Sequence, residues 1–194
     1  RVMASTSLCH QYFSDHMLQL TAAKAFSGSA DTMAAVKKLK SRVTFLNKSP
    51  QTSVKLANCQ KISPTARTLK LLCDVKTRWW STHTMVERAL KLRPAIEMMF
   101  RDEIVNRTSP GKPTPLEGLA LQPIDYVTLE HIVQVLAPFR EAQLALEGEK
   151  YVNLSLLVII IHELRTILEG LIAAVDPNDE PDLYDLLHKM ADDF

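Results

Sequence analysis

Apolar residues recur at steps of three and four along most of the chain, which is the spacing of one face of an α-helix. A first stripe follows Asp31, a plausible helix cap, and its members are Met33, Val36, Leu39, Val43 and Leu46. Pro50 interrupts this pattern and can open a second helix that runs to about Cys59. Four basic residues fall largely outside the first stripe: Lys37, Lys38, Lys40 and Arg42. We therefore expect a basic outer surface on the first helix.

The chain between the second helix and the next one has a mixed pattern. Residues 61–80 fit a loop, or a short extended piece around residues 69–75. Helical spacing resumes near Ser81 and continues to Met99. Because a proline inside a helix removes one backbone hydrogen bond, we expect Pro94 to kink this helix or to divide it in two.

The C-terminal part of the chain has the same helical spacing. One helix is expected over residues 126–146, with a bend at Pro138. Asn153 can cap a long helix, whose expected inner face is Leu157, Val158, Ile161, Leu164, Leu168, Leu171 and Val175. A short acidic helix is expected over residues 181–194. Strand signals are weak throughout, so the sequence predicts a mainly α fold, a helical bundle.

Prolines and glycines mark the expected domain organisation. Residues 106–125 hold four of the ten prolines and two of the five glycines, which indicates a surface loop. We expect this loop inside a helical domain that spans residues 31–175. Residues 1–30 would lead into that domain, and residues 176–194 would form an acidic linker and a truncated helix.

Charge is divided unevenly along the chain. The first 100 residues carry 16 Lys and Arg against 5 Asp and Glu, whereas residues 101–194 carry 7 against 17. A basic half favours a polyanionic partner, but attraction between the two halves would explain the division without any ligand. Hydrophobic residues make up 46% of the chain and its net charge is only +1, which excludes an intrinsically disordered protein. No apolar run reaches the roughly 18 residues of a membrane span.

The residue patterns that identify common enzymes are absent from the sequence. It has no phosphate-binding glycine loop, no GxSxG elbow, no HExxH motif and no paired CxxC. The six histidines are spread out, and we expect structural or surface roles for them rather than metal binding. Cys9, Cys59 and Cys73 are too far apart for a disulfide framework, which indicates a reducing compartment. The residues alone therefore predict no catalytic residue, no metal ligand and no cofactor in this chain.

One stretch combines cations with aromatic side chains. Eight basic residues and two acidic ones lie between residues 61 and 93, with both tryptophans, Trp79 and Trp80, in the middle. An indole can stack on an unpaired base while Lys and Arg bind phosphates. Alternatively, one indole anchors a helix to the core and Arg78 pairs with Asp74. Neighbouring residues cannot both face one core from a helix, so we expect one tryptophan to be exposed.

Four stretches of the chain follow one another in a characteristic order. Residues 15–20 read DHMLQL, residues 77–82 read TRWWST, and residues 85–96 follow as MVERALKLRPAI. Residues 137–161 read APFREAQLALEGEKYVNLSLLVIII. Together these stretches resemble hAT-type transposases and the BED zinc-finger proteins derived from them: DHMLQL is similar to the end of the family's CxxHxLxL element, and residues 137–161 are similar to its PF…gekY…lSl block. The resemblance covers roughly residues 13–175.

The resemblance implies a helical insertion within an RNase H-like catalytic domain whose three acidic metal ligands lie outside this chain. Residues 1–30 would then be the lead-in from that domain, with at most one short strand. By motif position, Trp79 would stabilise a flipped base beside a DNA hairpin. The expected DNA contacts are Trp79, Arg78, Lys76, Trp80, Lys37, Lys38 and Lys40. Three positions differ from the family pattern: Phe13 stands in place of the Cys that accompanies His16, Trp80 in place of an Asn, and His83 in place of an aromatic residue.

Three functions fit these observations. The first is a DNA-binding, non-catalytic segment of a transposase-derived nuclear protein, which would hold a hairpin or a single-stranded region. The second is a protein-interaction scaffold in a domesticated BED zinc-finger transcriptional regulator. The third is part of an active transposase that uses a divalent metal held by acids outside the chain. The resemblance also implies a homo-oligomer through a C-terminal region not present here, and no membrane partner is expected.

Overall fold

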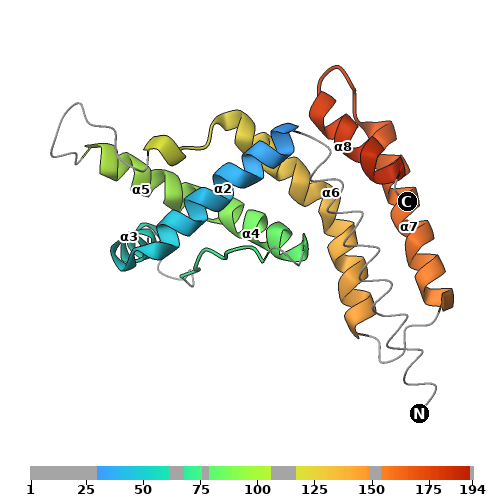
Figure 1. Cartoon of the computed structure of the whole chain (residues 1–194), viewed down its shortest axis with the longest axis horizontal. Coiled ribbons are helices and arrows are strands. Elements are labelled where there is room, and N and C mark those ends of the chain that lie inside the picture. The colour runs from blue at the N-terminus through green and yellow to red at the C-terminus, as the bar shows by residue number, and fades with distance from the viewer. Residues whose placement is uncertain (1–29, 62–67, 76–78, 106–116, 149–153, 193–194) are drawn as a thin grey trace, which may run out of the picture. The chain divides into compact units, whose positions relative to one another are not determined.

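The structure, a computed structural model, describes residues 30–61, 68–75, 79–105, 117–148 and 154–192. These residues contain seven α-helices, one short 3-10 helix and no strand (Figure 1), which confirms the mainly α fold. The helices are α2 (Ala30–Lys48), α3 (Pro50–Gln60), α4 (Trp79–Lys91), α5 (Arg93–Val105), η1 (Glu117–Leu119), α6 (Pro123–Gly148), α7 (Leu154–Ala174) and α8 (Pro181–Asp192). The short strand expected near the N-terminus, and the cap expected at Asn153, lie outside the described residues.

The chain divides into two compact units of opposite charge. The first, here called the basic unit, is Ala34–Glu130 and carries 17 Lys and Arg against 8 Asp and Glu. The second, the acidic unit, joins Arg1–Met33 to His131–Phe194 and carries 6 against 14. Helix α6 contributes to both. The domain boundaries expected from the sequence stay predictions.

Local sequence explains where the helices begin and end. Ser49 caps α3, because its Oγ accepts a hydrogen bond from the Thr52 N–H at 3.4 Å, and Pro50 opens the helix as predicted. Pro94 coincides with the division of the next helical stretch into α4 and α5, which confirms the expected break. Helix α4 begins at Trp79, two residues before the predicted start at Ser81. In α6, Pro138 lies inside one continuous helix.

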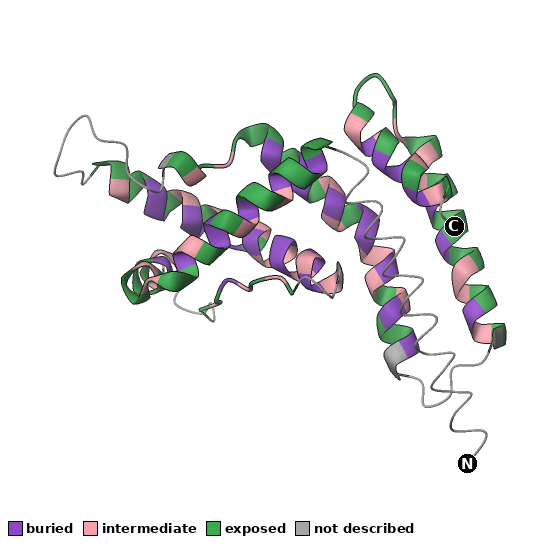
Figure 2. Cartoon of the chain, viewed as in Figure 1, coloured by how far each residue is buried: buried purple, intermediate pink, exposed green. Residues whose placement is uncertain are grey.

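The core of the basic unit combines four helices. Helix α5 packs against both α3 and α4. Its buried side chains join those of α2, α4 and α6: Leu39, Val43, Leu46, Met85, Val86, Ile96, Met99, Phe100, Tyr126 and Leu129. Figure 2 shows these buried positions as stripes along each helix.

Two predictions for α2 are wrong. Met33 was expected in the core but is 51% exposed, and Arg42 was expected on the outer surface but is only 3% exposed. The buried face of α2 is formed by Thr32, Ala35, Leu39, Arg42, Val43 and Leu46. Stepping back from Leu39 by four and seven residues reaches Ala35 and Thr32, and stepping forward by three reaches Arg42, so this face also follows the helical period.

In the acidic unit, α7 packs against α8 (Figure 1). Leu157, Leu164 and Leu168 form the buried stripe of α7 at steps of seven and four. Val158 was predicted on this face, but it is 63% exposed, because it lies about 100° around the helix from Leu157. Helix α8 buries four residues: Leu183, Leu186, Leu187 and Met190.

Candidate nucleic-acid interface

The three α2 lysines predicted to contact DNA differ in what they already bind. Lys37 is exposed and forms no ion pair with another described residue. The Lys38 Nζ lies 2.7 Å from Asp125 Oδ1 on α6, and the Lys40 Nζ lies 2.8 Å from Asp74 Oδ2. Two of these cations are therefore partly neutralised by carboxylates within the basic unit.

Asp125 occupies a setting that favours its charged form. Burial raises the pKa of this carboxyl, but three effects outweigh it: the hydrogen bond from Lys38, the hydrogen bond from the Gln122 backbone N–H at 2.8 Å, and the charge of Lys38. The net result is a pKa below the usual Asp value. The Lys38–Asp125 pair therefore links α2 to the first turn of α6, and Asp125 also caps that turn.

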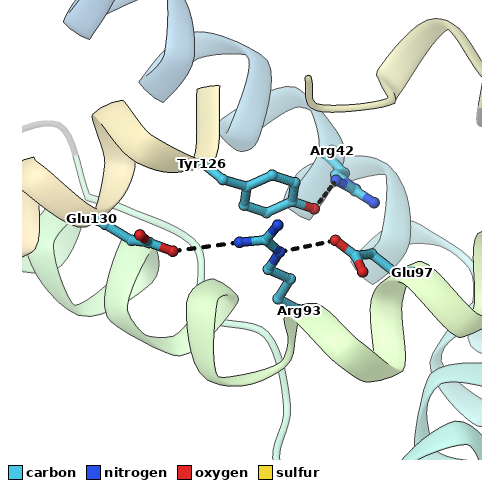
Figure 3. Close-up of polar contacts among 5 residues, drawn as sticks. All are labelled: Arg42, Arg93, Glu97, Tyr126 and Glu130. Carbon is cyan, nitrogen blue, oxygen red and sulfur yellow. Dashed lines mark hydrogen bonds and ion pairs between the residues drawn. The ribbon is translucent and has the colours of Figure 1, made fainter. Parts of the chain in front are cut away.

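Arg42, wrongly predicted at the surface, is buried and belongs to a network of polar contacts whose other end, at Arg93, Glu97 and Glu130, is partly exposed (Figure 3). Its Nη1 donates to the Tyr126 hydroxyl at 3.0 Å, and its guanidinium lies 4.0 Å from the centre of the Phe100 ring. The Arg93 guanidinium lies 4.0 Å from the centre of the Tyr126 ring and forms ion pairs with Glu97 and with Glu130 on α6. The network thus joins α2, α5 and α6.

Side chains from three helices hold segment 68–75 through its backbone. The Gln60 amide both accepts from the Leu69 N–H at 2.8 Å and donates to the Leu69 carbonyl at 2.9 Å, as a neighbouring strand would. Asn47 Nδ2 donates to the Leu71 carbonyl, and Arg88 donates to the Lys70 carbonyl. Residues 68–75 belong to no helix or strand, so whether the backbone there is a loop or a short extended piece stays a prediction.

The end of this segment is joined to the start of α4. The Ser81 Oγ accepts from the Val75 N–H at 2.7 Å and donates to the Val75 carbonyl at 3.1 Å. Because Asp74 contacts Lys40 and the adjacent Val75 contacts Ser81, the structure brings Lys40 close to the first turn of α4. This turn contains no acidic residue, and the dipole of a helix favours an anion at its N-terminus.

The predicted aromatic and cationic residues are only partly within the described structure. Trp79 is the first residue of α4, and its side chain lies outside the described part. Trp80 is half-buried on the same turn. Lys76 and Arg78 also lie outside the described residues, so the predicted contact of Arg78 with a phosphate or with Asp74 stays a prediction. Asp74 is bound by Lys40, a partner that sequence reasoning did not identify.

The described residues contain no group of three or more His, Cys, Asp or Glu placed to hold a metal ion. They also contain no helix that is long and apolar enough to span a membrane.

Comparison with known proteins places the matched region in the N-terminal and basic parts of the chain. Residues 14–114, just over half of the chain, match the family described as the ZBED1 RNase-like helical domain. No curated protein and no solved structure matches. The family match includes the α2 lysines, segment 68–75 and all of α4, and it is consistent with the sequence's resemblance to hAT-type and BED-related proteins. The chain belongs to the ZBED1 RNase-like helical domain family.

Proposed function

We propose that this chain is a DNA-binding helical segment of a transposase-derived nuclear protein. It would hold DNA at the first turn of α4, where an unpaired base of a hairpin or single strand stacks on Trp79. The observation that carries the proposal is the link from Lys40 through Asp74 and Val75 to Ser81, which holds the Lys40–Asp74 ion pair close to the first turn of α4, a turn that has no acidic residue of its own. We assign no catalytic step, metal or cofactor to these 194 residues.

The electrostatics of the basic unit support this proposal. It carries nine more basic than acidic residues, and Lys and Arg side chains that neutralise phosphates supply most of the affinity for nucleic acid without reading its sequence. Lys37 is exposed and available for such a contact. Lys38 and Lys40 would contribute less, because their carboxylate partners compete with phosphate. Lys76, Arg78 and Trp80 complete the proposed surface.

The experiment compares Trp79→Ala with Trp79→Phe in binding to a labelled hairpin with unpaired bases and to a plain duplex. Loss of one stacked base costs about 1–3 kcal/mol, so we expect about 5- to 150-fold weaker hairpin binding for Trp79→Ala, near wild-type binding for Trp79→Phe, and little change with duplex. Affinity should also fall steeply with salt. Unchanged hairpin affinity in a destabilised Trp79→Ala protein would contradict the proposal.

A second candidate is a protein-interaction scaffold in a BED zinc-finger regulator, with DNA bound elsewhere in the parent protein. The ion pairs of Lys38 and Lys40 favour it, because they give these two lysines a structural role. In that case the tryptophans stabilise α4 and hairpin binding by the chain would be weak and independent of Trp79. The oligomer expected from the resemblance, and membership of an active transposase, are separate proposals that this experiment does not address.

A further inference from the structure

A shallow hollow lies between α2 and η1 in the basic unit. Its volume is about 340 Å³. The described residues that line it come from two elements: Ala34, Lys37, Lys38 and Ser41 of α2, and Gly118, Leu119 and Ala120 at η1. Small and aliphatic side chains form its floor, while two ammonium groups and a hydroxyl stand on its α2 side.

We propose that this hollow binds an acidic amphipathic helix of another protein, with one apolar side chain of that helix in the hollow and a neighbouring carboxylate on Lys37. The volume is at the small end of the roughly 300–1,000 Å³ typical of ligand pockets, so it suits an anchoring side chain better than a cofactor. Helices that dock in grooves use apolar anchors of this kind.

The positive charge of the basic unit favours an acidic partner. The basic unit has an excess of nine cationic residues, and complementary charge steers and orients partners. Lys37 is exposed at the edge of the hollow and forms no ion pair with another described residue, so it can take a carboxylate. Lys38 is already bound to Asp125 at 2.7 Å and helps to hold the wall in place.

The lining favours a peptide over nucleic acid. No described lining residue is aromatic, so the hollow offers nothing for a base to stack on. A phosphate backbone gains little from an apolar floor, because its contacts are cations and hydrogen-bond donors. An apolar side chain of the partner helix matches the small and aliphatic lining residues, and a flanking carboxylate matches Lys37.

Gly118 lines the hollow and allows a bulky side chain to be added at its wall. A Cβ added at Gly118 meets no atom within 4 Å, so Gly118→Phe adds bulk at the hollow without pushing on the backbone. Gly170 on α7 has the same open surroundings but lies outside the hollow, which makes Gly170→Phe a matched control. Lys48, exposed at the end of α2, supplies the control for charge reversal at Lys37.

The experiment measures fluorescence anisotropy of a labelled 16-residue helical peptide of leucines and glutamates in amphipathic order, titrated with the full chain. We expect Gly118→Phe to weaken binding about tenfold or more and Lys37→Glu to weaken it about 3- to 10-fold. Gly170→Phe and Lys48→Glu should bind as wild type, and a scrambled peptide of equal charge should bind at least tenfold more weakly. Circular dichroism verifies that each variant is folded.

Four results would overturn the proposal. Equal binding of the scrambled peptide, or equal loss in Lys48→Glu, would show a response to charge alone. A loss of hairpin-DNA binding in Gly118→Phe as large as its loss of peptide binding would assign the hollow to nucleic acid. Self-association of the chain that Gly118→Phe abolishes would make a second copy the occupant. The hollow shares Lys37 and Lys38 with the proposed DNA-binding surface, but the two proposals can fail separately, since Trp79→Ala should weaken hairpin binding and leave peptide binding unchanged.

Discussion

The contact between Arg42 and Tyr126 gives the sharpest test of how the basic unit is stabilised. The change Tyr126→Phe removes the one oxygen that accepts from Arg42 Nη1, at 3.0 Å, and leaves the aromatic ring in place for Arg93. Both residues are buried, with 3% of Arg42 and 7% of Tyr126 exposed. Water therefore cannot readily replace the lost hydroxyl.

The magnitude follows from the charge on the donor. A hydrogen bond to a charged group contributes about 1.5–3 kcal/mol, and a buried donor without an acceptor pays its desolvation. The Phe100 ring continues to stabilise the guanidinium, so we expect Tyr126→Phe to lower the free energy of unfolding by about 2 kcal/mol. In Arg42→Met, which removes the cation, the same tyrosine change should cost much less.

The assay is urea unfolding followed by tryptophan fluorescence. Both tryptophans lie in the basic unit, so this signal reports the unit that contains the contact. Four proteins complete a double-mutant cycle: wild type, Tyr126→Phe, Arg42→Met and the double variant. Tyr184→Phe, on α8 in the acidic unit, is the matched control. A coupling free energy below about 0.5 kcal/mol would refute the assignment of Tyr126 as the acceptor that stabilises Arg42.

Three other predictions concern the pH dependence of stability, hydrogen exchange in segment 68–75, and the buried face of α7. The pKa of Asp125 is lowered, so its ion pair with Lys38 should make wild type more stable than Lys38→Met. This difference in the free energy of unfolding should be complete above the usual Asp pKa of about 3.9 and should disappear as pH falls through the lowered value. Urea midpoints of the two proteins measure it. Gln60→Ala should speed hydrogen exchange at the Leu69 backbone N–H, which donates to the Gln60 side chain. An unchanged exchange rate would contradict the inference that Gln60 holds segment 68–75. Leu168→Ala should cost about 2–5 kcal/mol and Val158→Ala less than about 0.5 kcal/mol in thermal unfolding of the acidic unit; the reverse order would contradict the corrected inner face.

The helices could be predicted from the sequence because the spacing of apolar residues agrees with the positions of the caps and prolines that begin and end helices. Ser49 and Pro50 mark the start of α3, and Pro94 the break between α4 and α5, since capping and the missing proline N–H act locally. The buried face was less certain where apolar residues are adjacent. Val158 is one of several consecutive apolar residues in α7, and only packing decides which of them is buried.

The burial and the partners of charged residues could not be predicted from the sequence, for a physical reason. Apolar spacing predicts that every Lys and Arg lies at the surface, but an arginine can be buried when a hydroxyl and an aromatic ring replace the water around its guanidinium. Arg42 has both, from Tyr126 and Phe100, more than 50 residues away in sequence. The helical period contained a usable signal, because Arg42 lies three residues after Leu39 and four before Leu46. The ion pairs of Lys38 and Lys40 also join distant segments, so spacing could not reveal them.

The charge division and the family match point to the same part of the chain. The match ends at residue 114, so it contains most of the basic unit and none of the residues from His131 onward, where the acid excess lies. At physiological salt a charge acts over only about 8 Å, so a bound polyanion senses the unit that it contacts rather than the net charge of +1. The salt dependence of binding should therefore count contacts made by the basic unit, and exposed neutralising changes in the acidic unit, such as Glu163→Gln, should leave its slope unchanged. A slope that rises with such changes would mean that the acidic unit screens the binding surface, and the interface would then have to include it.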